Sequence, residues 1–73
     1  MARNNLFNSL RSLSVGTIIK VEFPSKAKIY IINDDCDFCE LQITETGVYL
    51  GDPLNLDDMH SYLHLNSVNE IRM

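Results

Sequence analysis

Two cysteines and two histidines have the spacing of a chelating ligand set. Cys36 and Cys39 form a Cys-x-x-Cys pair, and His60 and His64 form a His-x-x-x-His pair. Zinc takes four such ligands in a tetrahedron, and short spacings let each pair chelate the ion. The 20 residues between the pairs exceed the usual gap, however, and acidic residues flank both cysteines. We therefore expect no metal and no other cofactor, with these four residues as the set to examine for zinc.

No other motif of catalytic chemistry is present in the sequence. The three glycines are isolated, so there is no Gly-rich phosphate loop, and no serine lies in a nucleophile-elbow pattern. The acidic residues fall mostly in predicted turns, where water levels the pKa differences that an acid–base pair needs. We expect a protein that works by binding and is not an enzyme.

Length and composition indicate one small globular domain over residues 1–73. The hydrophobic content is 45%. A chain of this size buries only about 60% of its unfolded surface, and self-association is a common way to bury more. No apolar run approaches the roughly 18 residues of a membrane span, and the N-terminus leads into an amphipathic stretch. These features predict a cytoplasmic protein with no membrane partner and with reduced thiols.

The first predicted element is a helix over residues 4–13, where Leu6, Leu10 and Leu13 recur at helical spacing. Gly16 suits the left-handed residue that follows a helix. Residues 17–73 are predicted to be rich in strands, because the apolar period changes to two.

Alternation predicts which side chains of the strands face the core. Ile19, Val21 and Phe23 form the first inward row, and turns are predicted at Pro24-Ser25 and at residues 33–37. Tyr30 and Phe38 are expected to point outward, and a short fourth strand is expected over residues 48–50. The further inward rows are Ala27, Ile29 and Ile31, then Cys39, Leu41 and Ile43.

Residues 60–65 allow two interpretations. As a strand, they point Leu63 and Leu65 inward; as a helix begun by Asp57 or Asp58, they place His60 and His64 on one face. We favour the strand, followed by a last strand ending at Met73. The predicted class is α+β, mainly β: an N-terminal helix followed by about five short antiparallel strands that form a small Sm/SH3-like barrel.

The helix sequence supports a resemblance to a known family. Leu6-Phe7-Asn8-Ser9-Leu10-Arg11 resembles the Phe-Leu-Asn-x-Leu-Arg of bacterial Sm-like (Hfq-type) proteins, and residues 64–68 are similar to that family's Lys-His-Ala-Ile-Ser segment. The resemblance implies a small barrel and a tendency to form rings. The Lys-His pair of the family's uridine pocket is absent, since Leu63-His64 stands nearest to it, so no binding residue is transferred.

The charge of the chain is divided along the sequence. Residues 1–28 hold five Lys and Arg residues against one acid, whereas residues 29–73 hold one Arg against nine acids. Acidic surfaces attract basic partners. We therefore expect a homo-oligomeric regulator or inhibitor, of a kind that phages also encode, which binds a basic protein. The predicted contact residues lie in turns and are Asp34, Asp35, Asp37, Asp57 and Asp58.

The basic residues support an alternative function. They could gather at one end of the molecule and bind RNA or a small nucleotide, with an aromatic ring stacking on a base. The residues of this alternative are Arg11, Lys20, Lys28, Tyr30 and His64. Self-association is also predicted, through outward apolar residues that are numerous for a small monomer. These are Ile18, Tyr30, Ile32, Phe38, Tyr49 and Tyr62.

Overall fold

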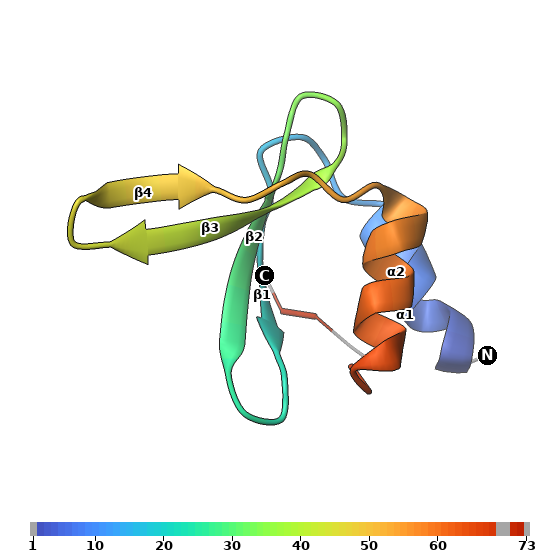
Figure 1. Cartoon of the computed structure of the whole chain (residues 1–73). Coiled ribbons are helices and arrows are strands. Elements are labelled where there is room, and N and C mark those ends of the chain that lie inside the picture. Colours follow the sequence, from blue (N-terminus) through green and yellow to red (C-terminus); the bar gives the residue numbers. More distant parts are fainter. Residues whose placement is uncertain (1, 69–70, 73) are drawn as a thin grey trace.

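Two helices and four strands make up the protein, whose computed structural model describes residues 2–68 and 71–72 (Figure 1). The α+β class, with a helix before antiparallel strands, is as predicted. The first helix begins and ends two residues earlier than predicted, and Gly16 has the expected left-handed backbone (φ 89°). In chain order the elements are α1 (Ala2–Arg11), β1 (Ile18–Glu22), β2 (Ala27–Ile32), β3 (Phe38–Thr44), β4 (Gly47–Leu50) and α2 (Leu56–Leu65).

The strands form one antiparallel sheet in the order β1-β2-β3-β4, in which each strand pairs with its neighbour in sequence. The prediction of a closed barrel with about five strands is wrong, because the sheet is open and the structure describes four strands. The outer edge of β1 is met by an isolated bridge, in which Lys20 and Arg72 exchange backbone hydrogen bonds of 2.7 and 3.1 Å. Residues 69, 70 and 73 of the predicted last strand lie outside the described residues.

The prediction of a strand over residues 60–65 is also wrong, because these residues belong to α2. The side-chain oxygen of Asn55 accepts a hydrogen bond from the backbone N–H of Asp58 (2.8 Å) and caps the helix. Asp57 and Asp58 in the first turn stabilise the helix, because their negative charges lie near the positive end of its dipole. The fully buried Met59 and Leu63 are four residues apart, which fits a helix and not a strand.

The register of β2 and β3 reverses the faces predicted for these strands, although Cys39, which was predicted to be inward, is buried. Tyr30 pairs with the buried Ile19, and Ile32 pairs with Phe38, and cross-strand partners point to the same face. Tyr30 and Phe38, predicted to be outward, are therefore core residues with 3% and 2% exposure. Residues 29–32 are apolar at both parities, so alternation alone does not decide which set faces the core.

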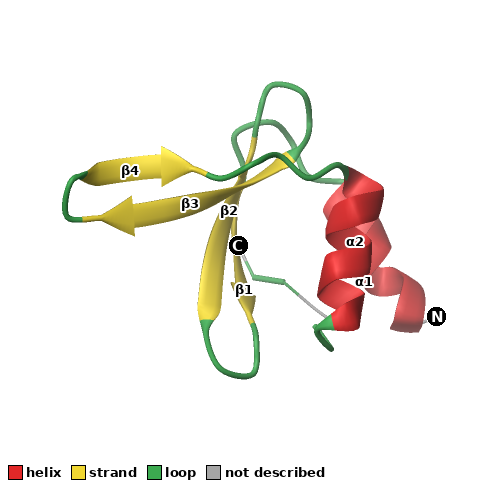
Figure 2. Ribbon diagram, in the orientation of Figure 1, coloured by secondary structure: helices red, strands yellow, loops and turns green. Residues whose placement is uncertain are grey.

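The two helices lie on the same side of the sheet, and the core fills the space between these layers (Figures 1 and 2). The β3–β4 hairpin projects away from the helices, and the molecule extends over 43 × 29 × 19 Å. Each helix and the first three strands contribute buried side chains. These are Leu6 and Leu10 of α1, Ile19, Val21, Tyr30, Ile32 and Phe38 of the sheet, and Met59 and Leu63 of α2.

Candidate protein-binding site

The turn between β2 and β3 carries three of the predicted contact residues. The side-chain oxygen of Asn33 accepts hydrogen bonds from the backbone N–H groups of Asp35 (3.0 Å) and Asp37 (2.9 Å). Cys36, in the left-handed region (φ 64°), donates its N–H to the Asn33 carbonyl (2.9 Å). The side chain of Asn33 thus supplies the hydrogen bonds that hold the turn, and the aspartate carboxylates are not needed for them. Asp34 and Asp35 are exposed, and Asp37 is half-buried.

The other two predicted contact residues lie at the start of α2, close to this turn. After β4, the chain returns along the end of β3, where Phe38 and Leu54 exchange backbone hydrogen bonds of 2.7 and 2.9 Å. This bridge brings the first turn of α2, with the exposed Asp57 and Asp58, to the same pocket as the β2–β3 turn. The structure thus brings together two acidic segments that are about 20 residues apart in sequence.

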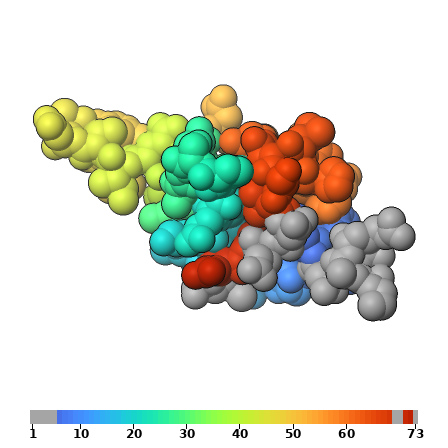
Figure 3. Space-filling view, turned by 90° about the horizontal axis from the view of Figure 1, so that it is seen from below, coloured from blue at the N-terminus to red at the C-terminus, as the bar shows by residue number. Residues whose placement is uncertain are grey.

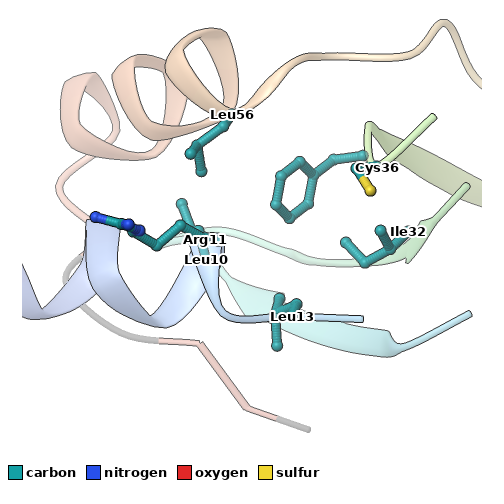
Figure 4. A pocket seen from close by; sticks show the side chains of 7 residues that line it. Leu10, Arg11, Leu13, Ile32, Cys36 and Leu56 are labelled. Atoms are coloured by element: carbon teal, nitrogen blue, oxygen red, sulfur yellow. The ribbon is translucent and has the colours of Figure 1, made fainter. Parts of the chain in front are cut away.

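A partly open pocket of about 170 Å³ lies between these two segments (Figure 4). Most of its wall is apolar, and Cys36 and Leu56 contribute one residue from each acidic segment. Arg11 lines the end of the pocket nearer to Leu56, and its side chain extends away from Cys36 in Figure 4. The lining residues are Leu10, Arg11, Leu13, Ile32, Cys36, Phe38 and Leu56. We call this pocket, with the five flanking aspartates, the acidic-rimmed pocket.

The charge separation of the sequence is not kept in the fold. Lys28 lies 3.6 Å from Glu40, so a basic residue of the first segment pairs with an acid of the second. Arg11 lines the pocket between the acidic segments. Within the described residues, the ion pairs link Lys20 or Arg72 to Glu22 and Lys28 to Glu40, and none includes the five contact aspartates.

The four Cys and His residues that were to be examined for zinc are not assembled into a site. Cys36 is exposed, whereas Cys39 is buried and its sulfur accepts a hydrogen bond from the Asn33 amide (3.5 Å). On α2, the rings of His60 and His64 stack at 6.2 Å. In the part of the chain that the structure describes, no three residues among His, Cys, Asp and Glu lie close enough to hold a metal ion.

The residues of the nucleotide alternative do not share one surface. Lys20 pairs with Ile29, whereas Lys28 pairs with the buried Val21, so the two lysines lie on opposite faces of the sheet. Tyr30 is buried and offers no ring to a base. His64 is on the exposed surface of α2, and Arg11 lines the pocket beside Leu56.

Lys28 instead belongs to a half-buried polar cluster on the helix side of the sheet. Its Nζ donates a hydrogen bond to the Tyr62 hydroxyl (3.2 Å) and lies over the rings of Tyr62 and Phe23, 5.5 and 5.9 Å from their centroids. The hydrogen bond to Tyr62 is the largest effect that raises the pKa of Lys28, and nearby Glu40 adds to it. These contacts give Lys28 a structural role that links β2, β3 and α2.

The sequence did not indicate the pocket itself or the exposure of several aliphatic residues. Of the apolar residues predicted to be outward, Ile18 and Tyr49 are exposed, Tyr62 is half-buried, and the others are buried. The aliphatic residues at both parities of β2 were a signal that this strand has two apolar faces.

Comparisons with protein-family models, with curated proteins and with solved structures found no match for this chain. The resemblance to the Sm-like family therefore stays a prediction, and the open sheet differs from the barrel that it implies. None of the described helices has the length and apolar character needed to cross a membrane.

Proposed function

We propose that this chain is a non-enzymatic regulator or inhibitor that binds a basic segment of another protein at the acidic-rimmed pocket. The observation that carries the proposal is the position of the apolar pocket between two exposed acidic segments. A partner with an apolar side chain flanked by Lys or Arg would place that side chain against Phe38 and Leu56. Its cations would then meet the aspartates, which attract them over several ångströms and speed association.

The five aspartates are the residues to change first. Replacing Asp34, Asp35, Asp37, Asp57 and Asp58 with Asn should weaken binding of a lysine-flanked leucine peptide by at least about tenfold, because each lost charge reduces the attraction. Fluorescence anisotropy of the labelled peptide measures the affinity at low and high salt. Glu45→Gln, at the tip of the distant β3–β4 hairpin, is the single-charge control for Asp35→Asn (Figure 1).

Two outcomes separate this site from a general effect of charge. A peptide with Gly in place of the central Leu should bind more weakly if the pocket holds the side chain; equal binding would show that the pocket is not used. If Glu45→Gln weakens binding as much as Asp35→Asn, the peptide responds to net charge alone and the proposal fails.

A further inference from the structure

The face of the sheet opposite the helices is aliphatic across all four strands. Cross-strand partners point to one face, so the pairs Ile18–Ile31 and Leu41–Leu50 assign side chains from every strand to it. Ile43 pairs with Val48 further along the hairpin. We call this surface the open sheet face. Its aliphatic residues are Ile18, Ile29, Ile31, Leu41, Ile43, Val48 and Leu50, and the buried Cys39 lies among them opposite Ile31.

Water reaches much of this face. The exposures of Ile18, Ile43, Val48 and Leu50 are 53%, 71%, 61% and 58%. At about 100 Å² for a fully exposed aliphatic side chain, the face presents roughly 300 Å² of aliphatic area. A chain of 73 residues has little core to offset such exposure, so covering the face would add substantially to its stability.

Charge favours a second copy of the chain as the cover. The chain has a net charge of −4, so two copies repel each other at most orientations. Among the described residues, the charged ones on the open sheet face are Lys20, Glu22 and Arg72 at the β1 margin, where Glu22 lies 3.7 Å from Lys20 and 3.9 Å from Arg72. The acidic turn and the start of α2 lie at the pocket on the helix side. Two copies therefore meet with least repulsion through the open sheet face.

The area of the face also fits a pair of copies. Two copies would together bury roughly 600 Å² of aliphatic surface, which is the apolar share of an interface of about 1,000 Å². An interface of this size reaches the lower limit of specific association. A twofold pair needs one self-complementary surface, and on the open sheet face the charged groups are confined to the β1 margin, so most of the face packs against its own copy through aliphatic side chains.

We propose that a second copy of this chain covers the open sheet face and that the protein is a homodimer with the two sheets packed face to face. The proposal does not depend on the acidic-rimmed pocket. Because that pocket is lined by Leu10 of α1 and Phe38 on the helix side, it stays accessible in both copies. Figure 3 shows the projecting β3–β4 hairpin, whose Ile43 and Val48 extend the face beyond the body of the molecule.

Ile43→Lys is the variant that tests the pairing, because the side chain is 71% exposed in one copy and would be buried in two. Native mass spectrometry and sedimentation between about 1 μM and about 1 mM should show a dimer for the unchanged chain. The variant should dissociate with a constant at least about 100-fold larger, since a lysine would be desolvated without a partner. Gln42→Lys is the matched control, because this exposed neighbour points to the opposite face.

Each result has a definite meaning once circular dichroism shows that both variants are folded. A dimer that Ile43→Lys dissociates and Gln42→Lys leaves intact supports the proposal. A monomer at all concentrations overturns the proposal. Binding of such a monomer to phosphatidylcholine vesicles would mean that lipid, and not a second copy, covers the face. Equal dissociation by both lysines, or an assembly that Ile43→Lys leaves intact, overturns the proposal too. The aspartate-to-asparagine variants should keep the dimer mass, so failure of peptide binding and failure of dimerisation are separate results.

Discussion

Leu63→Ala is expected to lower the free energy of unfolding by about 2–5 kcal/mol, whereas Leu65→Ala should change it by less than about 0.5 kcal/mol. The two leucines are in the same helix, but Leu63 is fully buried beside Met59 and Leu65 is 81% exposed. A chain of this length has roughly 4 to 11 kcal/mol of total stability, so Leu63→Ala removes a large share of it.

Urea unfolding followed by circular dichroism measures both losses. All proteins should be compared at one concentration, because self-association contributes to the apparent stability. Equal losses for Leu63→Ala and Leu65→Ala would contradict the structure, since they would mean that both side chains point into the core, as in a strand. The pair of variants therefore tests the most consequential difference between the sequence-based fold and the observed one.

Unfolding at alkaline pH is the second large effect expected. Burial raises the pKa of Tyr30 well above its ordinary value of 10.0, and the hydrogen bond with Tyr62 raises the pKa of Lys28 above 10.5. The folded state thus keeps protons that the unfolded state releases. The stabilisation is complete below about pH 10 and is lost as the pH rises through the folded-state values, by at most about 1.4 kcal/mol per pH unit for each proton.

The pH dependence of urea unfolding between about pH 8 and about pH 12 tests this expectation. Tyr30→Phe removes one of the two protons, so its stability should fall less steeply above pH 10 than that of the unchanged chain. Tyr49→Phe, which changes a phenol that is 49% exposed, is the control and should keep the original slope. A slope that Tyr30→Phe does not change would contradict the role of the buried phenol.

The parts of the fold that the sequence predicted correctly are those where one physical signal acts alone. In β1, polar Lys20 and Glu22 alternate with apolar residues, so Ile19 and Val21 had to face the core, and both are fully buried. In β2 both parities are apolar, and the choice depended on the large rings of Tyr30 and Phe38, which fill the space under the helices. Tertiary packing therefore determines which face of β2 points into the core, and the alternation of residue types does not predict it.

The helix α2 was the less favoured of the two interpretations of residues 60–65, although its signals are local. Asn55 followed by Asp57 and Asp58 is a capping pattern, and Met59 and Leu63 have helical spacing. The alternation of polar and apolar residues over 60–65 fits a strand equally well. The segment is too short for its apolar spacing to distinguish the helical period of 3.6 residues from the strand period of two. Once the segment is a helix, the described part of the chain holds no fifth strand that could close the sheet into a barrel.

The acidic residues of the candidate site were found from composition, but their arrangement was not. Asp35 and Asp58 were predicted to lie in turns or at a helix start, and both are exposed. That the two segments flank one pocket depends on the bridge between Phe38 and Leu54, which joins residues distant in sequence through backbone groups alone. The residue types in the sequence do not predict such a bridge, because backbone groups form it.

The strand order has a consequence for the way the chain reaches its folded state. Because β1, β2, β3 and β4 each pair with the next strand in sequence, the whole sheet can form by local hairpin closure, which is fast. Docking of α2 on α1 and the bridge between Lys20 and Arg72 instead join the two ends of the chain. The sheet should therefore assemble first during folding, and the docking of α1 and α2 on it should follow.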